Sequence, residues 1–296
     1  MKRLILFFVT NIAVLLTLGV VANILCVFLS GTTVEEAIGP EWTSLLIFAF
    51  VYGMLGSIIS LLMSKPIAKM ACGAQTINGT EGEAERWLVA TVEDLARRAG
   101  VKTPEVAIYE GAANAFATGA FKNSALVAVS TDILRQMSKE ELRAVLGHEM
   151  SHVANGDMVT LTLVQGVLNA FVIVVSRVLA SVLANERGGR RGNGGLYFLL
   201  VMVLQIALGV LASLVVMWFS RRREYAADAG SANLLGTPSP MIAALRRLGN
   251  LQPGVLPDSL RAMGIAEGKR KTSVWATHPS LDDRIAALQN LTVGLA

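Results

Sequence analysis

Four long stretches of the chain are almost free of charged side chains, and they constrain its fold more than any other feature. They lie at residues 4–30, 41–64, 158–185 and 195–220. A helix needs about 20 apolar residues to cross the hydrocarbon core of a bilayer, and each stretch is long enough. Charged residues make up only 16% of the chain, whereas a soluble domain carries about 25%. We therefore expect four hydrophobic helices.

The first stretch follows a positive pair, Lys2 and Arg3, so a cleaved signal peptide is the alternative to a membrane helix. The apolar core of a signal peptide is usually about 7–15 residues long, and this stretch is longer, which favours an uncleaved helix. The loop at 31–40 has acidic residues and no Lys or Arg. Because positive charge favours the cytoplasmic side, residues 1–65 are predicted to form two N-terminal transmembrane helices with both outer ends in the cytoplasm.

Residues 158–220 are predicted to form a hydrophobic helical hairpin that supplies transmembrane helices 3 and 4. Arg177 interrupts its first half, and a charge at the bilayer centre costs at least about 2.5–3.5 kcal/mol. The connection NERGGRRGNGG is itself basic, which is unusual for a loop on the outer side. The sequence leaves open whether this hairpin crosses the bilayer fully.

Residues 66–157 have the composition of a soluble domain. The segment 82–100 is predicted to be an amphipathic helix ended by a glycine. The next segments, PEVAIYE, NAFATGA and SALVAVSTDIL, are short and rich in Ala and Val, so they favour a small sheet. Ser138 and Glu141 then form a capping-box pattern, and Asn155 with the following glycine is a typical helix end. The sequence SKEELRAVLGHEMSHVANGD is therefore predicted to be a helix.

The last segment, 221–296, is also soluble in character, with helices expected near 239–249 and 280–291. The expected fold is a mainly α integral membrane protein that carries an α+β domain with a small sheet. Basic residues lie at the ends of segments and form no broad patch, so no nucleic acid is expected as a partner. The expected partners are the lipid bilayer and membrane-protein substrates, and the oligomeric state stays open.

The sequence HEMSH carries the strongest chemical signal. His148 and His152 are four residues apart and therefore lie on one face of the predicted helix. Neutral imidazoles are suitable zinc ligands, and Glu149 lies beside the first of them, where its carboxylate can take a proton from a water molecule. The alternative is a helix with two hydrogen-bonded histidines and a surface glutamate.

A catalytic zinc ion needs a third protein ligand and one open position. Glu224 and Asp228, in SRRREYAADAGSA, are again four residues apart. Glu224 is a candidate third ligand, and Asp228 is a candidate acceptor for the far nitrogen of a zinc histidine. The alternative is a helix at the membrane interface with ion pairs along its surface. Two crossings between His152 and Glu224 return the chain to the same side of the membrane, as shared coordination requires.

HEMSH followed by REYAAD, with apolar stretches before and between them and with NAFATG and THPS elsewhere, resembles the HtpX family of bacterial membrane zinc proteases. The resemblance covers essentially the whole chain. It implies a zincin-like catalytic domain of the gluzincin type in the inner membrane of a Gram-negative bacterium. It also implies one zinc ion per chain, held by His148, His152 and Glu224. In this reading Glu149 is the general base, and Asp228 orients a zinc histidine, most simply His148.

The resemblance extends to residues around these ligands. Asn114, Ala115, Phe116 and Ala117 resemble the edge strand on which the family lays its substrate. His278, in THPSLDDRI, is a candidate for stabilising the oxyanion or for blocking the open zinc position, and its alternative role is to cap the following helix. Arg284 is a weaker candidate for substrate binding.

The function implied is that of a zinc metalloendopeptidase for protein quality control and the stress response. Its substrates would be misfolded or damaged membrane proteins, cut on the cytoplasmic side, and self-cleavage in the loops at 186–195 and 250–271 is part of this expectation. A non-catalytic adaptor or metal sensor with a structural zinc site is the alternative. Such a site is usually closed by four protein ligands, and His278 is the candidate fourth.

Overall fold

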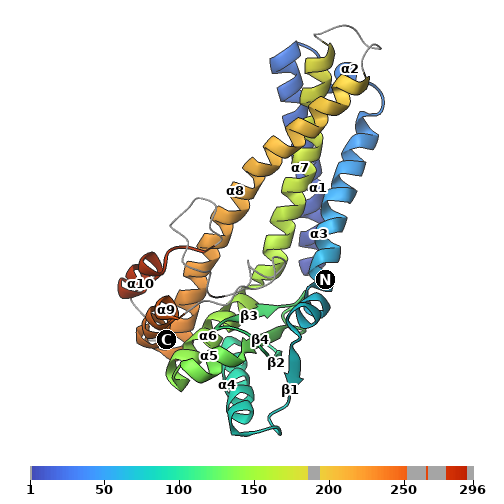
Figure 1. Ribbon diagram of the computed structural model, residues 1–296. Coiled ribbons are helices and arrows are strands. Elements are labelled where there is room, and N and C mark those ends of the chain that lie inside the picture. The colour runs from blue at the N-terminus through green and yellow to red at the C-terminus, as the bar shows by residue number, and fades with distance from the viewer. Residues whose placement is uncertain (1, 186–193, 252–264, 266–277, 292–296) are drawn as a thin grey trace. The chain divides into compact units, whose positions relative to one another are not determined.

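The computed structural model of the chain describes residues 2–185, 194–251, 265 and 278–291, and Figure 1 shows its arrangement. Its described helices and strands are, in chain order, α1 (Lys2–Ser30), α2 (Val34–Ile38), α3 (Trp42–Cys72), β1 (Gln75–Ile77), α4 (Glu83–Ala99), β2 (Glu105–Tyr109), β3 (Ala115–Thr118), β4 (Leu126–Ser130), α5 (Thr131–Gln136), α6 (Lys139–Asn155), α7 (Asp157–Asn185), α8 (Gly194–Leu235), α9 (Ser239–Asn250) and α10 (Leu281–Gln289). The loops at which self-cleavage is expected lie almost wholly outside these residues.

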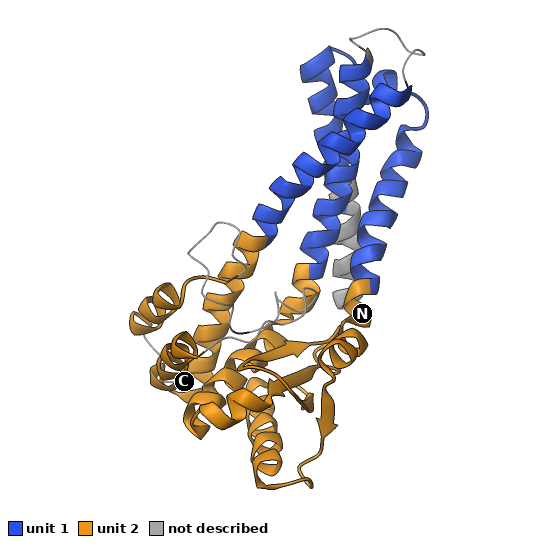
Figure 2. Cartoon of the chain, in the orientation of Figure 1, with its two compact units in different colours: residues 1–59, 162–216 blue, residues 60–161, 217–296 orange. Residues whose placement is uncertain are grey.

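The chain forms two compact units, coloured separately in Figure 2. Unit 1 consists of residues 1–59 and 162–216, and unit 2 of residues 60–161 and 217–296. The helices α3, α7 and α8 each contribute residues to both units. Every residue proposed above to bind metal or substrate belongs to unit 2.

Unit 1 is built from apolar helices. In the described part of the chain, α3, α7 and α8 are each long and apolar enough to cross a membrane, while the described apolar stretch of α1 is shorter, at Leu16–Ser30. Inside the unit, α3 and α7 approach closely at Gly53, where a methyl group would lie 2.7 Å from the backbone nitrogen of Ala170. Large apolar side chains stay exposed, such as Phe198 at 70%, which suits a surface in contact with lipid.

Two helices run further than the sequence pattern indicates. The fourth apolar stretch and the REYAAD segment form one continuous helix of 42 residues, α8. No Gly or Pro lies between Leu211 and Ala229, and the arginines at 221–223 favour helix, so nothing in the sequence ends the helix where its apolar part ends. Similarly, α3 does not end near residue 65 but continues through Pro66 to Cys72.

The sheet of unit 2 has the strand order β1-β2-β4-β3. The three expected strands are present, although the last four residues of SALVAVSTDIL form the start of α5, because the Ser130 hydroxyl caps a helix there. β1 is an additional strand that the sequence pattern did not reveal. β2 and β4 are parallel, and the other two pairs are antiparallel, which leaves β3 at one edge. One face of the sheet packs against α4, α6 and α9, and the other packs against the end of α3 through Ala68 and Cys72. The edge position of β3 leaves one side of its backbone free to pair with another chain.

The ends of α6 agree with the sequence prediction. The Ser138 hydroxyl accepts a hydrogen bond from the backbone N–H of Glu141, and the Glu141 carboxylate accepts one from the backbone N–H of Ser138. Gly156 adopts a left-handed conformation with φ 71°, which a residue with a side chain rarely takes. Its N–H donates to the carbonyl oxygens of His152 and Val153 in the last turn of the helix. These two signals place the HEMSH residues in the second half of a buried helix.

Candidate metal centre

Two pairs of small residues let α6 approach the C-terminal part of α8. A methyl group at Gly147 would lie 2.8 Å from Ser231 Oγ, and one at Gly230 would lie 2.5 Å from Ser151 Oγ. The Ser231 hydroxyl also donates a hydrogen bond of 2.7 Å to the carbonyl of Ala144. Because no larger side chain stands between the helices, side chains that flank these contacts on the two helices reach the same point.

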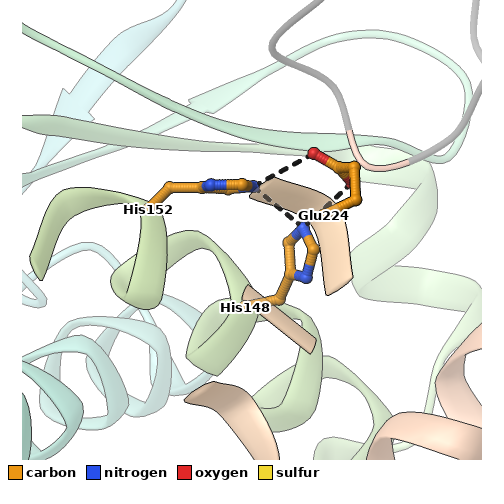
Figure 3. A group of neighbouring side chains, drawn as sticks. All are labelled: His148, His152 and Glu224. Carbon is orange, nitrogen blue, oxygen red and sulfur yellow. Dashed lines mark hydrogen bonds and ion pairs between the residues drawn. The ribbon is translucent and has the colours of Figure 1, made fainter. Parts of the chain in front are cut away.

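That point is occupied by His148 and His152 from α6 and Glu224 from α8, as Figure 3 shows. The three side chains are buried, and one ligating atom from each lies within 4.8 Å of the others. The two Nε2 atoms are 3.1 Å apart, and they lie 3.5 Å and 3.3 Å from the Glu224 oxygens. Ligands about 2.0–2.1 Å from a tetrahedral ion are roughly 3.3 Å from one another, so the three atoms have the spacing of zinc ligands.

Each imidazole is held from behind by a carboxylate. His148 Nδ1 lies 2.9 Å from Asp228 Oδ1, and His152 Nδ1 lies 2.6 Å from Asp157 Oδ2. A carboxylate on Nδ1 fixes the tautomer in which Nε2 carries the free lone pair, which is the form that binds metal. Asp228 was expected from the sequence, and Asp157 was not. Its position directly after the helix-ending Gly156 was the available signal, because a side chain there can reach the last turn of α6.

Arg284 of α10 is completely buried behind Asp228. Its guanidinium donates to both Asp228 oxygens, at 2.7 and 2.8 Å, and its Nη1 is 3.4 Å from Glu224 Oε2. These carboxylates raise the pKa of Arg284 further, although burial by itself would lower it. The described contacts of Arg284 lie within the protein, so the structure places it as a counter-charge for two buried carboxylates, and its role in substrate binding stays a prediction.

The electrostatics of the ligand histidines reflect the same neighbours. Burial by itself lowers the pKa of both imidazoles, but the carboxylates around them outweigh this effect. Asp228 and Glu224 raise the pKa of His148, and Asp157 and Glu224 raise the pKa of His152 to about 10. Without a metal ion, this negatively charged pocket therefore favours cationic histidines. Such a pocket is suited to hold a cation.

Glu149 is also buried, with 1% of its surface exposed. Its two carboxylate oxygens form no hydrogen bond of good geometry with the described residues, and the backbone N–H of Ala117 is the one described donor near enough to lower its pKa. Burial raises its pKa, and the charges of His148 and His152 only partly offset this. An unpartnered buried carboxylate is costly, so its retention beside the two histidines needs an explanation. A polar group delivered to the site, such as a water molecule or substrate, would supply the missing partner.

The expected substrate strand corresponds to β3 with Asn114 just before it. The Asn114 side chain is buried, and its Oδ1 accepts hydrogen bonds from the N–H groups of Ala115 and Ile265, at 2.9 and 3.1 Å. The Ala115 carbonyl also accepts from the N–H of Ile265, at 3.1 Å. The carbonyl of Ile265 in turn accepts from Arg284. Phe116 lies on the face of the sheet that does not pack against α6, and its ring packs against that of Tyr109. Part of the free edge of β3 is thus occupied by a residue of the same chain.

His278 lies close to the three candidate ligands. Its Nδ1 is 2.9 Å from Glu224 Oε2, and its side chain is 7% exposed. The following helix α10 is capped by Ser280, whose hydroxyl accepts from the N–H of Asp283. The capping alternative for His278 is therefore wrong, because a serine two residues further along takes that role.

Comparison with known proteins agrees with this geometry. The sequence profile described as Peptidase family M48 matches residues 83–292. The chain is 53% identical to a protein named Protease HtpX homolog from Verminephrobacter eiseniae, over 98% of this chain and 99% of the relative. A protein of the same name from Bordetella pertussis is 52% identical, over 99% of this chain and all of the relative.

Among solved structures, the chain resembles the crystal structure of S. mikatae Ste24p. The TM-score is 0.59 over 96% of this chain and 67% of that protein, with 18% sequence identity. At this identity the likeness concerns the fold alone. A fold of apolar helices combined with a small mixed sheet is therefore shared with that structure.

Proposed function

The chain belongs to peptidase family M48 as a membrane metalloprotease of the HtpX family, and on this premise we propose that it is a zinc-dependent endopeptidase. Its proposed substrates are misfolded or damaged membrane proteins, cut on the cytoplasmic side of a bacterial inner membrane, with self-cleavage as a further activity. The observation that carries the proposal is the set of three buried ligand atoms from His148, His152 and Glu224 beside the unpartnered carboxylate of Glu149.

The ligand set supports zinc as the metal, with one ion per chain. Two imidazole nitrogens and one carboxylate oxygen form the donor set typical of zinc peptidases, and three protein ligands leave one position open. Asp228 and Asp157 orient the two histidines through their Nδ1 atoms. When bound, zinc supplies Lewis-acid polarisation of the scissile carbonyl and lowers the pKa of a water molecule.

Glu149 acts as the general base in this proposal. It follows the first ligand directly in α6, and its oxygens are buried and form no hydrogen bond of good geometry with the described residues. It accepts a proton from the attacking water and returns it to the leaving amine of the peptide bond. A buried position suits this role, because burial raises the pKa of the carboxyl group and so favours its acceptance of a proton.

The substrate backbone pairs with the free edge of β3 in this proposal. A peptide added to a sheet edge is bound through main-chain hydrogen bonds, which hold many different sequences in the same position. The Ala115 carbonyl already accepts from Ile265, so a substrate strand pairs there only after exchanging this hydrogen bond. The enzyme thus binds its substrate in competition with its own chain.

The cytoplasmic location rests on topology. The basic flanks of the first two apolar stretches assign residue 65 onward to the cytoplasm by the positive-inside rule. The helix α7 and the apolar part of α8 lie between His152 and Glu224 in sequence, and two crossings return the chain to the side on which it started. Metal ligands that precede and follow this helical hairpin in the sequence can therefore belong to one site only if the hairpin crosses the membrane twice or not at all.

His278 supports two roles at this site. Its proximity to Glu224 suits a group that donates to the oxyanion or blocks the open metal position. The same proximity supports the second candidate function, a non-catalytic protein in which His278 completes a structural zinc site of four ligands. The two functions differ in whether purified protein cleaves a peptide bond at all.

The test pairs metal analysis with a cleavage assay on the full-length protein in detergent. Glu149→Gln should retain about one zinc per chain and lose cleavage of a model membrane protein by a factor of roughly 10² to 10⁴, the usual contribution of a general base. Glu140→Gln is the matched control, because Glu140 is an exposed residue in the first turn of the same helix. Cleavage by Glu149→Gln at the wild-type rate would remove Glu149 from its role. Absence of cleavage by the wild-type protein with its zinc bound would favour the structural site.

A further inference from the structure

Arg177 of α7 is the single charged residue within the apolar stretches 4–30, 42–64, 158–185 and 195–220. A charge at the bilayer centre costs at least about 2.5–3.5 kcal/mol, and charged residues inside membrane helices commonly mark sites of function. The candidate metal centre does not account for this one, because Arg177 belongs to unit 1 and the three candidate ligands belong to unit 2. Its presence in α7 therefore needs a separate explanation.

The guanidinium group of Arg177 lies deep along the apolar length of α7. Its Nη1 donates a hydrogen bond of 3.2 Å to the carbonyl of Ile173, one turn toward the start of the helix. From Ile173 to the last residue of α7, Asn185, the helix extends for about 18 Å at a rise of about 1.5 Å per residue. Half the thickness of the hydrocarbon core is about 15 Å. In an α7 that crosses the membrane, the charge therefore lies close to the middle of the bilayer.

The described neighbours of Arg177 give its charge no counter-ion. Its Cζ lies 5.8 Å from the centroid of the Phe48 ring of α3, which is a cation–π contact. Among the described residues, the guanidinium forms no ion pair and donates the single hydrogen bond to Ile173. A guanidinium has five N–H donors. Most of its capacity to bind an anion is therefore unused.

The charge can be reached from outside the seam between α3 and α7. These helices lie side by side in unit 1, where Gly53 meets the backbone of Ala170 (Figure 1). Arg177 follows Ala170 by two helical turns and so lies on the same face of α7, toward α3. The Arg177 side chain is partly exposed, and the neighbouring Phe48 ring is 51% exposed and stacks with the ring of Tyr52, which is 67% exposed. A helix lying along these two rings reaches the guanidinium.

The chemistry of the guanidinium selects a carboxylate as its partner. The two groups match in shape and charge, and their hydrogen bonds are about twice as strong as those between neutral groups. A second copy of this chain does not supply a carboxylate at this depth, because the stretches 4–30, 42–64, 158–185 and 195–220 contain no Asp or Glu. Lipid phosphates lie outside the hydrocarbon core, about 15 Å or more from its middle. A carboxylate near the middle therefore comes from a transmembrane helix of another protein.

We propose that Arg177, with the exposed rings of Phe48 and Tyr52, recognises a transmembrane helix that carries an Asp or Glu near the middle of the bilayer. The proposal rests on the proposed function and names its substrate class, which is membrane proteins whose intramembrane carboxylate has lost its own partner. In an assembled membrane protein such a carboxylate faces the protein interior and is paired. Only an unassembled or misfolded protein presents it at the lipid surface, so the charge distinguishes damaged substrates from intact ones.

The binding test uses the full-length Glu149→Gln variant in phosphatidylcholine vesicles, so that bound substrate is not cut. The probe is a synthetic transmembrane helix of Leu and Ala with one central Asp, and the comparison helix has Asn at that position. Energy transfer between labelled helix and labelled protein measures association. The Asp helix should bind at least about tenfold more tightly than the Asn helix. Adding Arg177→Gln should abolish this preference, and so should moving the Asp two turns toward either end of the helix.

Arg222→Gln is the matched control, because Arg222 is an exposed arginine of α8 that lies in unit 2 and stacks on Trp218. It removes the same charge outside the proposed site, so the preference for the Asp helix should be unchanged. Arg177→Asp should reverse the preference, so that a helix with a central Lys binds more tightly than the Asn helix. This reversal keeps the test decisive if Arg177→Gln lowers the amount of folded protein.

Equal binding of the Asp and Asn helices by protein that retains Arg177 would overturn the proposal. Arg177-dependent binding of an anionic lipid, without preference for the Asp helix, would overturn it as well, because the charge would then serve a lipid phosphate. A cleavage assay on zinc-loaded wild-type protein tests the proposed function separately. Selective binding by the Glu149→Gln variant, with no cleavage by the wild-type protein, would overturn the proposed function and leave the recognition site in place.

Discussion

Gly230 in α8 and Ser151 in α6 face each other so closely that a methyl group at position 230 would come within 2.5 Å of the serine oxygen and 2.8 Å of its Cβ. Gly147 and Ser231 form the same relationship with the helices exchanged. The two pairs determine how near Glu224 comes to His148 and His152. The spacing of the candidate metal ligands thus depends on four residues that are not themselves candidate ligands.

Gly230→Ala should therefore weaken metal binding without changing a ligand. The added methyl group pushes α8 away from α6, because its nearest neighbours include the Cβ of Ser151, which cannot rotate away. We expect lower zinc retention during dialysis against a chelator, and a lower melting temperature. Gly209→Ala in the same helix is the control, since a methyl group there meets nothing within 4 Å. The double variant Gly230→Ala with Ser151→Gly should recover zinc retention, and failure to recover it would show that crowding at this pair is not the cause.

Asp228→Asn should lower zinc affinity by about 10- to 100-fold, the usual effect of removing a carboxylate behind a zinc histidine. The asparagine keeps the size of the side chain but lacks the charge that orients His148 and that neutralises Arg284. Competition with a fluorescent chelator measures the change in affinity. Asp282→Asn, at an exposed position of α10, controls for the loss of one negative charge. Equal affinities for the Asp228 variant and the wild-type protein would contradict the positioning role.

Glu105 provides a pH-dependent contribution to the stability of unit 2. Hydrogen bonds from Lys65 and Lys69, each 2.7 Å long, lower the pKa of its carboxyl group. A carboxyl group with a lowered pKa in the folded state stabilises the protein above its unfolded pKa of about 4.3, and this contribution is lost as the pH falls through the folded pKa. The Glu105 side chain is 44% exposed, so we expect each of its two ion pairs to contribute at most about 1 kcal/mol to the free energy of unfolding.

Glu105→Gln should accordingly lower the melting temperature at pH 7, and the difference from the wild-type protein should shrink as the pH is lowered below about 4. Thermal unfolding in detergent at several pH values measures this. High salt should reduce the difference at pH 7, because partly exposed charges are screened. A difference that is independent of both pH and salt would show that the ion pairs are not its source.

Gly53→Ala should destabilise unit 1. A methyl group at position 53 would lie 2.7 Å from the backbone nitrogen of Ala170 and 3.0 Å from the carbonyl oxygen of Gly166, and neither backbone atom can move without shifting α7. Overpacking of this kind typically costs about 1–3 kcal/mol. Gly56→Ala, three residues along α3, is the control, since nothing lies within 4 Å of its added methyl group. Thermal unfolding in detergent should separate the two variants, and equal melting temperatures would rule out the close approach.

Much of the local structure was predictable from the sequence, because it depends on residues close together in the chain. The capping box at Ser138 and the left-handed Gly156 delimit α6, and the four-residue spacing places His148 and His152 on one face of that helix. The apolar stretches predicted the long helices in the same way. The end of α8 was not predictable from hydropathy, because the helix continues into a polar sequence of equal helix propensity.

The sequence by itself identified the candidate metal ligands and general base and the order in which they occur. Only the tertiary structure decided which of them meet. The roles of Asp228 behind His148 and of Ile265 on the edge of β3 depend on contacts between residues that are far apart in the sequence. Periodicity reports the face of a helix on which a residue lies, whereas the distance between two helices is set by the volume of the side chains between them, here a pair of glycines and a pair of serines.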